Sequence, residues 1–144
     1  MKSIHICFTV FVVISFTIGL TGDSAEADGI NWRAYDEGMV LGKIEKKKIF
    51  LHFYADWCRY CLMMAKDTFQ DPAVVFFLNE HFVSIRVDID NDRQTAVKYG
   101  VLGLPYTALL TEMGEPIGAM PGYISAGNLL AILKEVQTIK SSDL

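Results

Sequence analysis

The chain has 144 residues and carries 13 lysines and arginines against 17 aspartates and glutamates, a formal net charge of −4. A chain of this length suits a single domain with one modest core. A mildly acidic surface gives no support to nucleic-acid binding.

The first 27 residues read as a targeting segment rather than as part of the domain. Lys2 precedes an apolar run over residues 4–20, and Ala25 and Ala27 then form an A-x-A cleavage pattern. These features are typical of a secretory signal peptide. We therefore expect a signal over 1–27, a domain over 28–144, and a periplasmic or otherwise exported location. The alternative is an uncleaved membrane anchor through residues 4–20, because the run is long for a signal and short for a membrane span.

The chain after residue 28 begins with a helical pattern. An amphipathic helix is predicted over 31–46, a short apolar strand over 49–54, and a helix that begins near Cys58. The apolar positions expected to face the core are Trp32, Tyr35, Met39 and Ile44 in the first helix, and Cys61, Leu62, Ala65 and Phe69 in the second.

The middle of the chain continues the alternation. Asp71 can cap a helix and Pro72 fits its first turn, so another helix is predicted there. A strand is predicted over 82–89. Asp92 or Asn91 is expected to cap the next helix, which Gly100 closes.

The last third predicts a hairpin and a final helix. Strands over 106–110 and 115–120 flank a turn, and Pro116 places the second strand at the sheet edge. The final helix begins at Ser125, and its expected buried face is Leu129, Leu130, Leu133 and Val136. The element order is a helix followed by β-α-β-α-β-β-α. This order predicts an α/β fold with a mixed central sheet covered by helices on both faces.

Two cysteines carry the chemistry of the expected mature domain, because Cys7 lies in the leader. A disulfide between Cys58 and Cys61 closes a very short loop and would add little stability, so redox chemistry explains the pair better than a structural role. The N–H groups at a helix start stabilise a thiolate. We expect Cys58 to be the exposed nucleophile and Cys61 the thiol that resolves the mixed disulfide. Arg59 should further lower the pKa of Cys58.

Metal and cofactor sites fit the pair less well. A zinc site needs about four ligands, and only His52 and His81 could join the cysteines. A c-type haem motif requires histidine where Leu62 stands. We therefore expect no metal and no cofactor beyond the redox-active Cys58–Cys61 disulfide.

The sequence from about residue 32 to 136 resembles the thioredoxin superfamily. Within it, the sequence is similar to the C-terminal periplasmic domain of the thiol:disulfide interchange protein DsbD and to small exported thioredoxins. The matching motifs, in chain order, are Phe53-Tyr54-Ala55-Asp56-Trp57-Cys58 with Cys61, Thr68-Phe69, Asp71-Pro72 with Val74, Val87-Asp88, Lys98-Tyr99-Gly100-Val101 and Gly103-Leu104-Pro105.

The resemblance implies a thioredoxin fold, here with an extra N-terminal helix, and a cis peptide before Pro105 opposite the cysteines. The Leu104 backbone would then pair with an extended client segment. Trp57, Tyr60 and Tyr106 would form an apolar rim around the sulfur, and Arg59 completes the expected client-binding residues. For Trp57 and Tyr106, ordinary packing is the alternative.

Three features depart from the family pattern. His52 stands where thioredoxins carry a buried acid, and a buried neutral imidazole could accept a proton from Cys61. The alternative for His52 is a core histidine bonded to a backbone carbonyl. Arg86 stands where a buried lysine is frequent, and we expect it to reach solvent with its stem along the sheet. Arg59-Tyr60 between the cysteines differs from the usual Gly-Pro and leaves the direction of electron flow open.

Together these observations predict an exported thiol:disulfide oxidoreductase that reduces protein disulfides. Its expected partners are disulfide-containing or dithiol client proteins and a membrane electron donor, and no nucleic acid. Nothing in the pattern suggests a dimer seam, so we expect a monomer. One alternative is an oxidase or isomerase that uses the same residues. Another is a thioredoxin-fold binding or chaperone module in which redox chemistry is incidental.

Overall fold

The computed structural model describes residues 29–139, so the predicted signal peptide over 1–27 lies outside the described residues. The elements in chain order are β1 (Trp32–Arg33), α1 (Tyr35–Glu45), β2 (Lys48–Tyr54), α2 (Arg59–Asp67), α3 (Pro72–His81), β3 (Phe82–Asp88), α4 (Arg93–Lys98), β4 (Tyr106–Leu110), β5 (Pro116–Pro121) and α5 (Ala126–Thr138).

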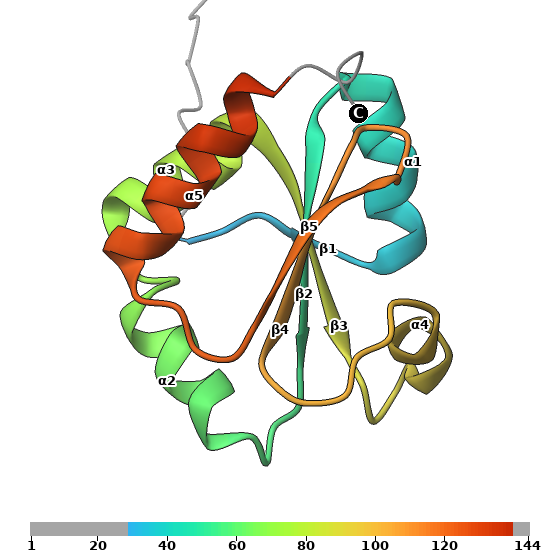
Figure 1. Cartoon of the computed structure of the whole chain (residues 1–144), viewed down its shortest axis with the longest axis vertical. Helices are drawn as coiled ribbons and strands as arrows, with labels where there is room; N and C mark the ends of the chain where they lie inside the picture. The colour runs from blue at the N-terminus through green and yellow to red at the C-terminus, as the bar shows by residue number, and fades with distance from the viewer. Residues whose placement is uncertain (1–28, 140–144) are drawn as a thin grey trace, which may run out of the picture.

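The strands form one mixed five-stranded sheet in the order β1-β3-β2-β4-β5. The β1–β3 and β2–β3 pairs are parallel, and the β2–β4 and β4–β5 pairs are antiparallel. Helices α2, α3 and α5 lie on one side of the sheet, and α1 and α4 lie on the other (Figure 1). This arrangement confirms the predicted fold class, including the edge position of the strand that carries Pro116.

The first predicted helix begins later than expected. Trp32 and Arg33 form β1, which pairs with Ser84 and Ile85 of β3, and the helix starts only at Tyr35. The helical spacing of apolar residues over 31–46 did not predict this strand. Its two residues are extended because they pair with β3, which is distant in the sequence. The helix ends at Glu45, and Lys46 follows in the left-handed conformation.

Glycines, rather than large apolar residues, form the buried face of α1. Gly38 and Gly42 are buried, whereas Ile44, which was expected in the core, is 70% exposed. A Cβ at Gly38 would overlap the Ile85 side chain, and one at Gly42 would lie 2.9 Å from Ile49 Cδ1. The helix can therefore approach the sheet closely only because both positions lack side chains.

Helix α2 also buries a different set of residues than expected. Cys61 is buried as predicted, but Leu62 is 49% exposed and Met64 is fully buried in its place. Phe69 is also buried, but it lies beyond the helix, which ends at Asp67. The following helix α3 confirms its predicted start, because the Asp71 carboxylate accepts hydrogen bonds from the Ala73 and Val74 N–H groups. Leu129, Leu133 and Val136 of α5 are buried, as predicted.

The close approach of α1 predicts that Gly38→Ala destabilises the fold. The new methyl group must displace Ile85, which is fully buried, and overpacking of this kind costs about 1–3 kcal/mol. Gly127→Ala in α5 is the matched control, because no atom lies within 4 Å of the added Cβ. It should leave stability unchanged or raise it by up to about 1 kcal/mol. Urea unfolding of both variants measures the difference, and equal midpoints would contradict the tight contact.

Candidate functional site

Three loops meet at one end of the sheet, the lower end in Figure 1. Strands β2 and β3 are parallel, so their carboxyl ends at Tyr54 and Asp88 lie at the same edge. The Ile89 N–H donates to the Tyr54 carbonyl at 3.0 Å and joins the two loops that follow. The chain between α4 and β4 reaches this edge as well. Side chains from segments distant in the sequence therefore gather around the start of α2.

The two cysteines lie at this junction and are joined in a disulfide. Cys58 is the N-cap of α2, and its sulfur accepts a hydrogen bond from the Cys61 N–H at 3.2 Å. Cys58 is only 6% exposed and Cys61 3%, so Cys58 is more covered than predicted. Tyr54 and Leu104 are among the residues that pack against the cluster formed by the cysteines and Ala55. The arrangement gives Cys58 an N–H donor and the positive end of a helix, both of which favour a thiolate.

The loop before β4 supplies a second wall of the site. The Leu104–Pro105 peptide bond is cis. Pro105 is buried, and its carbonyl accepts a hydrogen bond from the Gly122 N–H at 2.7 Å. Leu102 in the same loop is completely exposed, which the sequence analysis did not single out. This loop is thus anchored at Pro105 and exposes the apolar side chain of Leu102 to solvent.

The large side chains expected around the sulfur do not form a single group. Trp57 and Tyr60 are 68% and 57% exposed, and Arg59 between the cysteines is exposed as well. Tyr106 instead packs its ring edge-on against Phe53, with 6.0 Å between the ring centroids, in the core on the α1 and α4 side of the sheet. Trp57 and Tyr60 are therefore available to a partner, whereas Tyr106 is engaged in internal packing.

A carboxylate holds the indole of Trp57. Trp57 Nε1 donates to Asp90 Oδ2 at 2.8 Å. Asp90 is itself positioned by Asp88, whose carboxylate accepts from the Asp90 N–H and from Asn91 Nδ2. Asp92 caps α4 as predicted, and its hydrogen bonds with Thr95 lower its pKa. The acidic loop after β3 thus fixes a residue next to Cys58, a link that no local sequence pattern signals.

His52 is buried on the sheet face that α2 covers. It is 1% exposed, and its Nδ1 shares a hydrogen bond with Thr107 Oγ1 at 3.1 Å. The Phe69 ring meets the imidazole edge-on, with 4.9 Å between the centroids. Burial, and then the positive charge of Arg86, lowers the pKa of His52 to about 3. The imidazole is therefore neutral at physiological pH, and its observed Nδ1 partner is a hydroxyl rather than a backbone carbonyl.

Arg86 lies beside His52 in the sheet and does not simply extend into solvent. Its Cζ is 3.7 Å from the Tyr54 ring centroid and 5.9 Å from that of Trp32. Its Nε is buried and makes no hydrogen bond. Arg86, His52 and Thr107 are cross-strand neighbours on β3, β2 and β4. They form one polar row across the sheet beneath α2.

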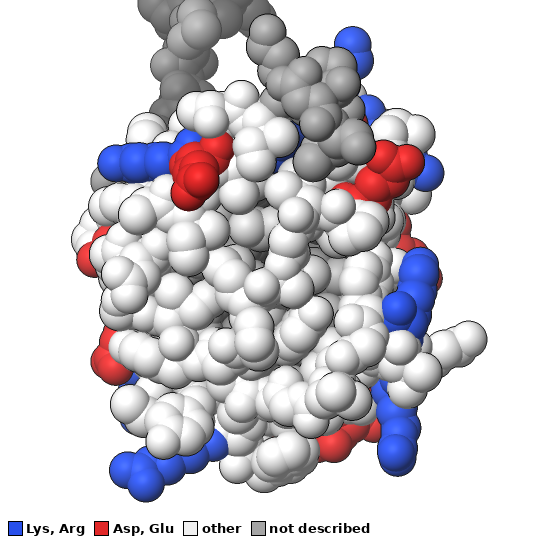
Figure 2. Space-filling view, viewed as in Figure 1, with Lys and Arg blue, Asp and Glu red and all other residues white. Residues whose placement is uncertain are grey.

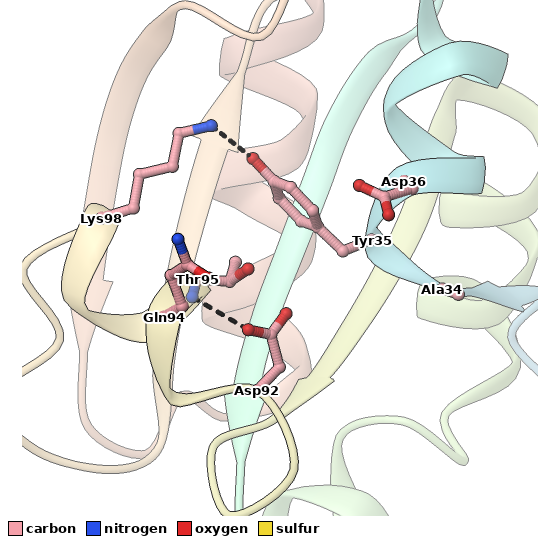
Figure 3. A pocket seen from close by; sticks show the side chains of 7 residues that line it. All are labelled: Ala34, Tyr35, Asp36, Asp92, Gln94, Thr95 and Lys98. Carbon is pink, nitrogen blue, oxygen red and sulfur yellow. Dashed lines mark hydrogen bonds between the residues drawn. The ribbon is translucent and has the colours of Figure 1, made fainter.

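A separate cavity of about 720 Å³ opens between the start of α1 and α4 (Figure 3). Its lining residues are Ala34, Tyr35, Asp36, Asp92, Gln94, Thr95 and Lys98. Lys98 Nζ donates to the Tyr35 hydroxyl at 2.9 Å, and the Asp92 carboxylate accepts from the Thr95 N–H (Figure 3). Several of its polar groups therefore bond to one another, and neither cysteine lines it.

The face that carries the edge strand β5 is uncharged at its centre, and Lys, Arg, Asp and Glu lie at its margins (Figure 2). This face offers no basic patch. Within residues 29–139, no cluster of three or more His, Cys, Asp or Glu residues could hold a metal ion. In the same residues, no helix has the length and apolar character needed to cross a membrane.

Comparison with known sequences identifies relatives among thioredoxin-like and thiol:disulfide interchange proteins. Residues 35–137 match a family described as a thioredoxin-like domain. The chain is 30% identical over 112 residues to the thiol:disulfide interchange protein DsbD of Vibrio vulnificus strain CMCP6, an alignment that covers 74% of this chain and 19% of the relative. It is 28% identical over 113 residues to the chloroplastic thioredoxin-like protein HCF164 of Oryza sativa subsp. japonica, with 76% and 41% covered. The chain thus spans only 19% to 41% of the length of these two relatives.

Solved structures show the same fold. A thioredoxin from Thermus thermophilus superimposes with a TM-score of 0.69 at 24% identity, over 76% of this chain and 88% of that one. The DsbH oxidoreductase gives a TM-score of 0.68 at 20% identity, over 77% and 86%.

The neutral state of His52 predicts how stability depends on pH. The unfolded chain binds a proton on this histidine below about pH 6.5, whereas the folded chain does so only near its pKa of about 3. Folding stability should therefore fall as the pH drops from 6.5 toward 3, by about 1.4 kcal/mol per pH unit, and should be unaffected by His52 above 6.5. Denaturant unfolding at pH 7, 6, 5 and 4 measures the slope, which His52→Gln should reduce. Parallel curves for wild type and His52→Gln would contradict the buried neutral imidazole.

Proposed function

The chain belongs to the thioredoxin-like domain family, and we propose that it reduces disulfide bonds in client proteins through Cys58 and Cys61. The observation that carries this proposal is the position of Cys58. It caps α2, its sulfur accepts the Cys61 N–H, and the two sulfurs are joined as a disulfide. A pair so close in sequence at a helix start suits reversible redox chemistry far better than structural cross-linking.

The reaction proceeds in two exchange steps. The Cys58 thiolate attacks one sulfur of the client disulfide, forms a mixed disulfide, and releases the other client sulfur as a thiolate that takes up a proton. Cys61 then loses its proton and attacks the Cys58 sulfur, which releases the second client thiol and closes the Cys58–Cys61 disulfide. Two electrons pass to the client, and an external dithiol must return two electrons to the pair.

His52 is proposed as the acceptor of the Cys61 proton. It lies on the sheet face that α2 covers, is almost fully buried, and is neutral at working pH. A neutral imidazole can take a proton. The hydrogen bond between Nδ1 and Thr107 Oγ1, at 3.1 Å, holds the ring in place. The base would act only during resolution of the mixed disulfide, when Cys61 must become a thiolate.

The surroundings of the pair suit a protein client. Trp57 and Tyr60 are exposed beside Cys58, and Leu104 packs against the cysteine cluster while its backbone precedes the cis bond to Pro105. We propose that an extended client segment lies between these two walls and contacts Arg59 at the helix start. Tyr106 contributes by supporting the second wall through its packing on Phe53.

The proposal extends to location and electron supply. The signal pattern in residues 1–27 and the resemblance to the periplasmic domain of DsbD support an exported domain, with a membrane anchor through residues 4–20 as the alternative form. A membrane dithiol protein is the proposed donor, and we propose that the domain acts as a monomer.

The direction of electron flow can be tested by the reduction potential of the purified domain, equilibrated against glutathione or dithiothreitol. Thioredoxin lies near about −270 mV and the oxidant DsbA near about −120 mV. We expect a value closer to the first, together with reduction of insulin disulfides by the dithiol form. Cys58→Ser and Cys61→Ser should each abolish turnover, and only Cys61→Ser should accumulate a mixed disulfide. A potential near the second value would make the domain an oxidase.

The proposed role of His52 predicts slower resolution in His52→Gln, which retains a polar partner for Thr107 but no basic nitrogen. Release of a preformed mixed disulfide on Cys58 should slow about 10- to 100-fold, less than the usual ~10²–10⁴-fold for general acid–base catalysis, because a pKa of about 3 makes His52 a weak base. Formation of the mixed disulfide should be unaffected. Stopped-flow rates of both steps between pH 5 and 9 separate the two effects. An unchanged pH profile for release would remove His52 from the mechanism.

A further inference from the structure

Arg86 brings a positive charge under the redox pair. The residue lies on β3 directly opposite His52, on the sheet face that α2, α3 and α5 cover. Its guanidinium carbon is 3.7 Å from the centroid of the Tyr54 ring and 5.9 Å from that of Trp32. The two rings therefore hold the cation against the sheet instead of leaving it fully in water.

No acid in the described part of the chain forms an ion pair with Arg86. The two ion pairs observed there join Arg33 to Glu37 and Lys47 to Glu45. Arg86 Nε is buried without a hydrogen-bond partner. Asp88, the next residue on the same face of β3, directs its carboxylate oxygens to the Asp90 N–H and to Asn91 Nδ2.

The other groups that face the cation are neutral or aromatic. His52 on β2 is neutral, and Thr107 on β4 presents a hydroxyl to the imidazole. Trp32 on β1 and Tyr54 on β2 contribute rings. Beyond Tyr54, the exposed Asp56 and Arg59 flank the cysteines with opposite charges. Arg86 is therefore the only charged member of the row that it forms with His52 and Thr107, and the carboxylates of Asp88 and Asp90 lie toward the end of the sheet beyond it.

One aromatic ring contacts both Arg86 and the cluster that contains the cysteines. Tyr54, which carries the guanidinium on its face, packs against the cluster of Ala55, Cys58 and Cys61. Charges within a partly buried region of this kind interact strongly because water screens them little.

We propose, on the basis of the function proposed above, that Arg86, which has no ion-pair partner among the described residues, stabilises the reduced form of the Cys58–Cys61 pair and so raises its reduction potential. Two glutathione molecules reduce the disulfide and yield one glutathione disulfide and the two protein thiols. Two electrons enter the pair, and Cys58 retains a negative charge when its proton is released to water. Only the reduced form carries this charge, so a nearby cation favours reduction.

The equilibrium constant for this reaction with glutathione tests the proposal. Arg86→Gln should lower the constant about tenfold, which corresponds to a potential about 30 mV more negative, and should shift titration of the Cys58 thiol to higher pH. Arg86→Met, which keeps a long stem on Tyr54, should give the same result. Arg86→Lys should stay within about twofold of wild type because it retains the positive charge, although the ammonium loses the planar stacking on Tyr54. Arg33→Gln, an exposed arginine on the neighbouring strand, is the matched control and should change nothing.

Different results would overturn the role of Arg86 and the proposed reductase function. If Arg86→Gln or Arg86→Met folds, by circular dichroism, with an unchanged constant, then Arg86 only packs against the rings and the proposal is overturned. The same conclusion follows if Arg86→Lys falls as far as Arg86→Met. If the wild-type pair neither equilibrates with glutathione nor reduces insulin, the reductase function itself fails.

Discussion

The hydrogen bond from the Cys61 N–H to the Cys58 sulfur ties the chemistry of this domain to its fold. It exists because β2, the central strand between β3 and β4, ends where α2 must begin. Pairing on both sides fixes the strand, so the first turn of the helix has a fixed origin. Cys58 at the N-cap then accepts a hydrogen bond from the Cys61 N–H and lies at the positive end of the helix dipole, and no other side chain is needed for either contact. The redox pair is thus a consequence of one strand-to-helix junction.

The row of Arg86, His52 and Thr107 beneath this junction sets its charge. A guanidinium, a neutral imidazole and a hydroxyl cross three strands, and none of the three is an acid. The imidazole is kept neutral first by burial and then by the arginine, so one ring nitrogen carries a hydrogen and the other keeps its lone pair. The same arginine favours negative charge on the nearby sulfur. The two roles proposed for this site, proton acceptance and thiolate stabilisation, therefore fall on adjacent residues of one sheet face.

Sequence reasoning recovered the parts of the structure that local chemistry determines. The Asp71 and Asp92 caps, the edge strand with Pro116 and the cysteine junction all depend on a few consecutive residues. It missed β1 and the glycine face of α1, which exist only because β3 is present to pair with Trp32 and to be approached by Gly38. The Trp57–Asp90 bond and the stacking of Arg86 on Tyr54 were equally invisible, since each joins residues more than 30 positions apart.

The proposed effect of Arg86, a higher reduction potential of the Cys58–Cys61 pair, is compatible with a reductase. It would, however, restrict the client disulfides that the pair can reduce. Electrons flow only toward disulfides of higher potential than the domain's own pair. Structural disulfides buried in stable proteins lie at low potentials, whereas strained or exposed disulfides lie higher. Access favours the same kind of client disulfide. Cys58 is nearly covered while Trp57 and Tyr60 beside it are exposed, so only a disulfide on an accessible client segment can reach the sulfur. If the proposed function holds, electrostatics and access both favour labile, exposed protein disulfides as its clients.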